Sequence, residues 1–281
     1  MERKDITYQD KLDELKMFFD DDKSKEQVLI FVEGPSDVRL FRKFFDDEKC
    51  NVEYIPEGKT KLENCMSILL NFSPLLVGIR DADFLHLETA EYQVTNIFLT
   101  DFHDTEMTIL AQGKVWNALF YEYSNLAKAE QLETKENLLK TIADVSYLRW
   151  LNDIENLELK FKAGFVSLMD FDNHTINFSE YFRRTLGKSP NAILTDINVI
   201  QEKITALKTQ NPDLLQLTNG HDFLKTLAEY LREKYGNKGL SEAILASSLR
   251  IRFDFQTFQQ TALFQQLNDW AVTNNVVIWE N

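Results

Sequence analysis

The chain has 281 residues, of which 44% are hydrophobic and 12% aromatic, and its formal net charge is -14. This composition excludes a disordered protein, and the length suffices for one large domain or two of ordinary size. The negative charge excludes broad neutralisation of phosphates by surface lysines and arginines, although bound divalent metal ions let an acidic enzyme act on phosphates.

Cysteine content and hydropathy bear on the cellular compartment. Two cysteines, Cys50 and Cys65, are too few for a zinc framework or a disulfide scaffold. The first residues lack the apolar core of a signal peptide, and no apolar run approaches the roughly 18 residues of a membrane span. We therefore expect a cytoplasmic protein that does not enter a membrane.

The first expected element is an amphipathic helix over residues 8–20, where apolar side chains recur at helical spacing among charges. It ends in an acidic triplet at residues 20–22. Because lysines follow at once, this triplet indicates a solvated helix end and not a metal site.

A strand, a tight turn and a helix follow. Residues 28–32 are five consecutive apolar residues and predict a fully buried strand. Gly34 and the proline after it break the strand, and Ser36 is a candidate cap for the next helix. Glu33 and Asp37 flank this turn. Open α/β sheets bind ligands at the carboxyl ends of their strands, so both acids lie where chemistry is expected.

A second strand is expected over residues 51–55, followed by Gly58-Lys59-Thr60. The tripeptide resembles the end of a phosphate-binding P-loop, but Glu53 stands where the first glycine is required. The sequence therefore excludes a P-loop ATPase. Lys59 stays a candidate to contact a phosphate, and the alternative is an ordinary surface lysine.

Residues 62–69 predict another helix, and residues 75–79 another buried strand that ends at Asp81 and Asp83. Alternating strands and helices predict a parallel sheet with right-handed crossovers. Residues two apart in extended chain point the same way, about 6.5 to 7 Å apart along the strand. We therefore expect both carboxylates to face one pocket.

Residues 94–99 predict a further strand that leads into a helix. Asp101 and Asp104 precede that helix, and each is a candidate cap for it. Glu106 lies one turn inside the helix and is a candidate to reach back toward Asp81.

From residue 115 onward the pattern is almost wholly helical. Residues 162–169 predict a last strand that returns to the sheet, and the acids at 170–172 are expected to form a turn. His221 begins one of the later helices and is either a cap or surface residue or a histidine drawn toward the acids. Later helices are expected over residues 177–186, 193–208, 220–235, 240–251 and 255–273.

Basic residues cluster at few places in this helical half. If nucleic acid binds, the natural phosphate contacts are Arg183, Arg184, Lys188, Arg250 and Arg252.

Five acids are expected at one edge of the sheet: Glu33, Asp37, Asp81, Asp83 and Glu106. Clustering that many negative charges is costly unless cations join them. Ligation by oxygen alone favours hard ions, Mg²⁺ or Mn²⁺. Such ions activate water and neutralise the leaving oxygen of a phosphodiester, so the set predicts phosphoryl chemistry.

The order of these motifs resembles the TOPRIM domain of topoisomerases, primases and OLD-family nucleases. Four sequences carry the likeness: Val-Glu-Gly-Pro-Ser-Asp, Gly-Ile-Arg-Asp-Ala-Asp-Phe, Thr-Asp-Phe-His-Asp-Thr-Glu and Asn-Gly-His-Asp-Phe-Leu. They are most similar to the small, stand-alone TOPRIM effectors related to OLD nucleases, a group that includes the effector of the PARIS anti-phage defence system. The TOPRIM motifs cover residues 27 to about 110, and the Asn-Gly-His-Asp stretch alone carries the likeness further on.

The resemblance implies an α/β fold: a Rossmann-like TOPRIM domain with a mainly parallel sheet, plus a mostly α-helical C-terminal region. The expected organisation is an N-terminal helix over residues 1–23, the TOPRIM domain over 24–112 and the helical region over 113–281. One strand near 163–169 is expected to return to the sheet.

The resemblance also implies roles for individual residues. Glu33 matches the TOPRIM glutamate, a metal ligand or general acid/base, and Asp81 and Asp83 match the metal-binding pair. Asp37 and Glu106 match further metal ligands of OLD-type members. With Lys59, the expected catalytic residues are Glu33, Asp81 and Asp83, with Mg²⁺ or Mn²⁺ as the cofactor.

By the same resemblance, the expected activity is metal-dependent cleavage of nucleic acid, with RNA such as host tRNA favoured over DNA, as the toxic step of abortive infection. The expected partner is an ABC-type ATPase that holds the effector until a phage protein is sensed. A homodimer of the active effector is part of the same expectation.

Three alternatives bear on this interpretation. A topoisomerase or primase is disfavoured, because no separate cleavage domain with a catalytic tyrosine, zinc-binding segment or helicase region is evident. A HAD-type phosphatase would use Asp81 as nucleophile, but Leu85 stands where a Thr or Val is expected, and Glu33 would have no role. The third is a catalytically inactive TOPRIM module that binds and regulates a partner ATPase.

Overall fold

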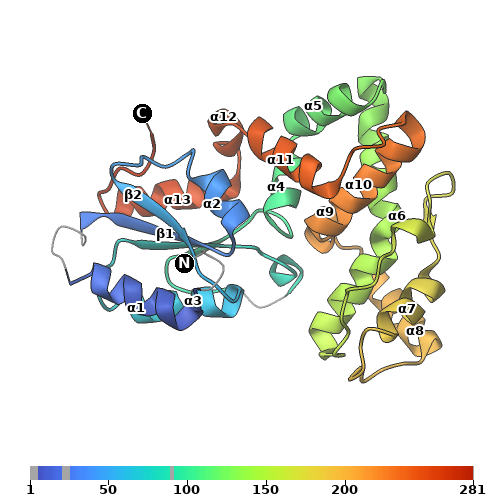
Figure 1. Cartoon of the computed structure of the whole chain (residues 1–281), viewed down its shortest axis with the longest axis horizontal. Helices are drawn as coiled ribbons and strands as arrows, with labels where there is room; N and C mark the ends of the chain where they lie inside the picture. The colour runs from blue at the N-terminus through green and yellow to red at the C-terminus, as the bar shows by residue number, and fades with distance from the viewer. Residues whose placement is uncertain (1–5, 21–25, 89–91, 281) are drawn as a thin grey trace. The chain divides into compact units, whose positions relative to one another are not determined.

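The computed structural model describes residues 6–20, 26–88 and 92–280. Most of the acidic triplet expected at the end of the first helix, Asp21 and Asp22, lies outside the described residues. The chain forms two compact units (Figure 1). Unit 1 comprises Met1–Ala82, Ala90–Asp101 and Asp254–Asn281, and unit 2 comprises Asp83–Thr89 and Phe102–Phe253.

Unit 1 is built on a four-stranded parallel sheet in the order β2-β1-β3-β4. The strands are β1 (Val28–Val32), β2 (Cys50–Tyr54), β3 (Leu76–Arg80) and β4 (Ile97–Leu99). The helices are α1 (Tyr8–Phe18), α2 (Pro35–Phe41), α3 (Lys59–Leu69), α12 (Phe255–Phe258) and α13 (Ala262–Thr273). The α/β class and the parallel pairing predicted from the alternating pattern are confirmed.

One face of the sheet is covered by α1 and α3 (Figure 1). Successive side chains of a strand point to opposite faces, and Leu29 and Phe31 of β1 point to this one. They pack with a buried cluster from both helices and the neighbouring strands: Leu12, Leu15, Phe19, Ile55, Leu62, Cys65, Met66, Leu69, Leu76 and Ile97. Burial in this cluster raises the pKa of the Cys65 thiol to about 12, so Cys65 is a core residue and not a nucleophile.

The opposite face carries α2 and α13 (Figure 1), and its contacts are largely aromatic. The rings of Phe44 and Phe258 stack with their centroids 4.6 Å apart. Trp279 stacks on Phe45 at 5.0 Å and on Phe264 at 4.7 Å. Stacked aromatic pairs contribute about 0.5–1.5 kcal/mol each beyond the area they bury. The last segment of the chain is therefore part of the core of unit 1.

Unit 2 is mainly helical and is organised around α6 (Lys128–Glu155). Its other α-helices are α4 (Thr105–Ala111), α5 (Gly113–Tyr123), α7 (Phe178–Leu186), α8 (Ile197–Lys208), α9 (Leu214–Leu217), α10 (Gly220–Tyr235) and α11 (Glu242–Arg252). None of the helices in the described part of the chain combines the length and apolar composition that a membrane span requires.

The prediction that residues 163–169 return a strand to the sheet is wrong. Residues 166–168 form a turn of 3₁₀-helix, and β5 (Met169–Asp170) pairs with β6 (Thr175–Ile176) in a separate antiparallel hairpin. The cause is local: a carboxylate oxygen of Asp170 accepts the N–H groups of Asp172 and Asn173, each at 3.0 Å. This Asx-turn folds the chain back on itself, as expected for turn-forming acids.

The helix start after β1 also differs from the prediction. Gly34 occupies the N-cap position and the following proline begins α2, whereas Ser36 lies inside the helix and does not cap it. A proline at the first helical position has its fixed φ angle already set for the helix.

We predict that Gly78→Val in β3 destabilises the protein. A Cβ at Gly78 would lie 3.0 Å from Cγ1 of Ile97 and 3.2 Å from Cδ2 of Leu62, so the close packing of α3 on the sheet requires a glycine there. Overpacking of this kind costs about 1–3 kcal/mol, which chemical denaturation measures. The control is Gly113→Val, where a Cβ has no neighbour within 4 Å. Equal stability of the two variants would contradict the prediction.

Candidate functional site

The carboxyl edge of the unit 1 sheet brings together residues from three neighbouring strands. Glu33 directly follows β1, Asp81 directly follows β3, and Lys59 begins α3 shortly after β2. Because β1 lies between β2 and β3, Glu33 is at the centre of this edge. Oε1 of Glu33 accepts a hydrogen bond from the backbone N–H of Asp81 at 3.1 Å. All three side chains are half-buried.

Asp37 is the third residue of α2, and its carboxylate closes the turn that follows Glu33. Oδ2 of Asp37 accepts the backbone N–H of Gly34 at 3.0 Å. A carboxylate in the first turn also interacts favourably with the partial positive charge of the helix N-terminus. Asp37 therefore has a structural role in this turn. If it also binds a metal ion, its carboxylate must do so while it accepts the Gly34 N–H.

Asp83 belongs to unit 2 and departs from the extended chain that the sequence suggested. β3 ends at Arg80, and Asp83 has a φ of 48°, in the left-handed region that Asp tolerates better than most residues. Its N–H donates to the carbonyl of His103 at 2.6 Å. Asp83 itself therefore leaves the extended conformation, and the expectation that Asp81 and Asp83 face one pocket stays a prediction.

Glu106 lies in the first turn of α4 in unit 2 and is only 8% exposed. The helix begins at Asp104, whose Oδ1 accepts the N–H of Met107 at 2.9 Å, so Asp104 is the predicted cap. Its Oδ2 accepts the N–H of Gly220 at 2.6 Å. Complete burial and the nearby charge of Glu106 raise the pKa of Asp104 to about 7, although both N–H donors oppose the shift.

Asp101 caps a different helix from the one expected. Its Oδ1 and Oδ2 accept the N–H groups of Leu263 and Ala262, each at 2.8 Å, so it closes the N-terminus of α13 in unit 1. The alternative that Asp101 caps the helix after it is wrong. A carboxylate that accepts two N–H groups of a helix start satisfies donors that the helix itself cannot satisfy.

His221 lies at the start of α10, and its side chain is exposed. Nδ1 of His221 lies 2.6 Å from Oε1 of Glu242 on α11. Partial burial acts to lower the pKa of His221, but the negative charges of Glu106, Glu242 and Asp104 outweigh it and raise that pKa. His221 is thus a surface histidine whose pKa is raised by nearby acids of α4 and α11.

Within residues 6–20, 26–88 and 92–280, no three His, Cys, Asp or Glu side chains converge on a point that would hold a metal ion. The donors at the carboxyl edge nevertheless suit Mg²⁺, because they are oxygens. Mg²⁺ is often held by one or two carboxylates with waters and substrate phosphates completing its shell. Glu33 and Asp81 would supply such a pair.

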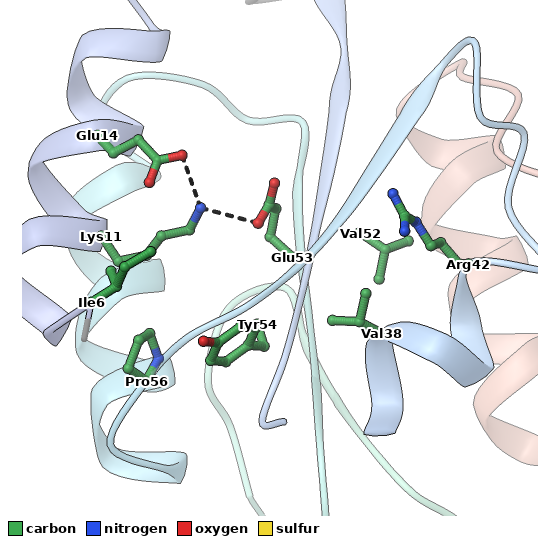
Figure 2. Close-up of a pocket in the computed structure, with 9 residues that line it drawn as sticks. All are labelled: Ile6, Lys11, Glu14, Val38, Arg42, Val52, Glu53, Tyr54 and Pro56. Carbon is green, nitrogen blue, oxygen red and sulfur yellow. Dashed lines mark hydrogen bonds and ion pairs between the residues drawn. The ribbon is translucent and has the colours of Figure 1, made fainter. Parts of the chain in front are cut away.

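A well-formed pocket of unit 1 lies elsewhere, beside β2 (Figure 2). It measures about 150 Å³, less than the 300–1,000 Å³ typical of ligand sites. Lys11 reaches across from α1, and its ammonium lies 3.1 Å from Glu14 and 3.0 Å from Glu53. Two carboxylates therefore already compensate Lys11, and Arg42 is the other cationic side chain of the described lining.

The sequence did not identify the contact between Gly220 and the acids of α4. A Cβ at Gly220 would clash with Oδ1 of Asp104 and would lie 2.6 Å from Cβ of Glu106. The only signal in the chain is the Asn-Gly pair at 219–220, which marks a helix start but does not say what packs against it.

We predict that Gly220→Ala destabilises unit 2 by about 1–3 kcal/mol and displaces Asp104 and Glu106, because the added methyl group has no room. Thermal unfolding measures the loss, and the control is Gly239→Ala, where a Cβ has no neighbour within 4 Å. Identical unfolding of the two variants would show that the contact is not tight in solution.

Comparison with known proteins does not place the chain in a family. No model of a known protein family matches it, and no curated protein has significant similarity to it. The likeness to TOPRIM proteins therefore rests on the sequence motifs and their order alone, and it enters the functional interpretation as a proposal.

Proposed function

We propose that this protein is a metal-dependent nuclease of the TOPRIM type that hydrolyses phosphodiester bonds. One observation carries the proposal: Oε1 of Glu33 accepts the backbone N–H of Asp81, so residues that follow two adjacent parallel strands meet at the carboxyl edge of the sheet. In open α/β folds this edge is where ligands bind. A Rossmann-like TOPRIM domain is the finer fold assignment that belongs to the same proposal.

The electrostatics of this edge favour phosphate chemistry with a cation. Carboxylates at one sheet edge repel a phosphate unless positive charge is present. Glu33 and Asp81 would hold Mg²⁺ or Mn²⁺, which when bound neutralises the phosphate and activates water. Lys59 on the neighbouring strand's loop would add a fixed positive charge. The sequence also predicts three further metal ligands, Asp37, Asp83 and Glu106, and these roles stay predictions.

The side chains and backbone at this edge would orient the general base and bind the phosphate. The N–H of Asp81 fixes Oε1 of Glu33, so the glutamate is oriented before substrate binds. In the proposed reaction Glu33 takes the proton of the attacking water as the water oxygen bonds to phosphorus, the P–O bond to the leaving strand breaks, and solvent protonates the leaving oxygen. Lys59 would bind a non-bridging oxygen of the phosphate. General base catalysis of this kind typically contributes 10²- to 10⁴-fold.

Substrate and partners follow from the sequence resemblance. RNA such as host tRNA is the proposed substrate, and an ABC-type ATPase is the proposed partner that restrains the enzyme. A homodimer as the active form and a cytoplasmic location complete the proposal.

A second function deserves a test because of two observations. Glu33 and Asp37 already accept backbone N–H groups that hold the fold, and the described residues contain no ready cluster of three metal ligands. Both features fit a module that has kept its acids for folding and that binds and regulates a partner ATPase without cutting.

We predict that Glu33→Gln and Asp81→Asn each reduce Mg²⁺-dependent cleavage of RNA by about 10²- to 10⁴-fold. Both substitutions preserve shape, and a glutamine at position 33 still accepts the Asp81 N–H, so the fold is expected to persist. The measurement is cleavage of a labelled tRNA by the full chain. The control is Glu26→Gln, an exposed glutamate near the opposite end of β1. Full activity in both variants would refute the nuclease.

We also predict that Mg²⁺ stabilises the wild-type protein against thermal unfolding. A ligand that binds only the folded state stabilises it by about 2.7 kcal/mol when its free concentration is 100 times its dissociation constant. The Glu33→Gln/Asp81→Asn double variant should lose this stabilisation, whereas Glu26→Gln should keep it. If wild-type protein shows no Mg²⁺-dependent shift, the inactive-module function is favoured instead.

A further inference from the structure

Unit 2 contains a basic hollow of about 670 Å³ between the loop before β5, the end of α7 and α10. Four cationic side chains line it, Lys162, Arg183, Arg184 and Lys188, against one carboxylate, Glu229. In a chain with a net charge of -14, most of the surface repels a polyanion. A concave site with an excess of positive charge is therefore unusual for so acidic a chain, and its cationic residues need a structural or a functional reason.

The two arginines have structural partners. Nε of Arg183 lies 2.7 Å from Glu180, and Nε of Arg184 lies 2.9 Å from the same carboxylate. These contacts lower the pKa of Glu180 to about 2. Arg184 also donates through Nη1 to Ser167 at 3.3 Å. Positive side chains near the end of a helix are, in addition, stabilised by its dipole. Fold stability thus accounts for both arginines.

Fold stability does not account for the two lysines. Lys162 and Lys188 are exposed, and neither has an ion pair among the described residues. Both line the hollow from different segments of the chain, one before β5 and the other after α7. Two uncompensated ammonium groups beside an arginine pair that Glu180 holds in place form a site suited to phosphate oxygens.

The rest of the lining indicates which part of a ligand the site contacts. Small residues, Ala163, Gly164 and Gly187, leave room for close approach of a ligand. None of the described lining residues is aromatic, so the hollow offers no ring on which a base could stack. Such a site would bind the phosphate backbone and would contribute no sequence selectivity.

We propose that this hollow binds phosphate groups of a nucleic acid strand, and that Lys162 and Lys188 are its principal contacts. The inference rests on the proposed nuclease function for its choice of ligand, and it names a binding site separate from the acids of the sheet edge. Its expected effect is to add affinity for RNA of any sequence.

The test is binding of a fluorescently labelled single-stranded RNA to the full chain in EDTA, where no metal-dependent cleavage occurs. We expect Lys162→Ala/Lys188→Ala to bind more weakly than wild type. Each lost phosphate contact lowers the slope of log K against log salt by about 0.7 for a single strand, so the double variant should lose about 1.4. The loss should be equal for two RNAs of unrelated sequence.

The matched control is Lys128→Ala/Lys238→Ala, two exposed lysines of unit 2 outside the hollow without an ion pair among the described residues. Its net charge change is identical, and we expect binding close to wild type. Equal weakening of both double variants, or no weakening of either, would overturn the proposal. Absence of RNA binding by wild type would overturn it as well.

Two competitors identify the ligand. Inorganic phosphate should displace RNA only weakly, because it offers one group where the strand offers several. If polyglutamate displaces the labelled RNA as effectively as unlabelled RNA of equal charge does, the phosphate assignment is overturned and an acidic protein is the favoured ligand. If RNA binding depends on Lys162 and Lys188 but the wild-type protein does not cleave RNA in Mg²⁺, this binding site is upheld and the nuclease function is refuted.

Discussion

The hydrogen bond from the Asp81 N–H to Glu33 joins the ends of two strands that are 48 residues apart in the chain. It exists because β1 and β3 are neighbours in a parallel sheet, so that both end at the same edge. That pairing in turn depends on helices that cross over both faces of the sheet. The close approach of α3 at Gly78 is one such constraint, since it sets the distance between helix and sheet. Core packing and the position of the acids are therefore consequences of a single topology.

Much of this topology could be predicted because its signals are local. The apolar runs at 28–32 and 75–79 are too continuous for strands with a solvent-exposed face, and the intervening helical stripes require parallel pairing. The membership of α13 in unit 1 could not be predicted. An amphipathic pattern shows that a helix has an apolar face but does not identify its partner. The stacking of Trp279 on Phe45 depends on contacts that are distant in sequence.

The site shows the same division. The neighbourhood of Glu33 and Asp81 follows from the rule that parallel strands end together, and it needs no knowledge of side-chain packing. The left-handed backbone of Asp83 could not be predicted, because it has no signature in the sequence beyond the residue's being an aspartate. The helix that Asp101 caps could not be predicted, because a capping carboxylate can accept N–H groups from a helix that is near in space but distant in sequence. The Gly220 contact could not be predicted for the same reason. A glycine at a helix start indicates only how the helix begins, whereas here the missing side chain makes room for Asp104 and Glu106, which are buried.

The division of unit 1 into three chain segments has a consequence for how the protein is made. Residues 254–281, which complete its aromatic face, are separated from the rest of that unit by the whole of Phe102–Phe253. The entropic cost of closing so long a loop grows only with the logarithm of its length, so the arrangement is thermodynamically tolerable. Its timing is different. On the ribosome, the strands and the acids emerge first, while the helix that Asp101 caps emerges after unit 2 has been synthesised. The carboxyl end of β4, where Asp101 meets α13, therefore reaches its final form only after unit 2 has been synthesised.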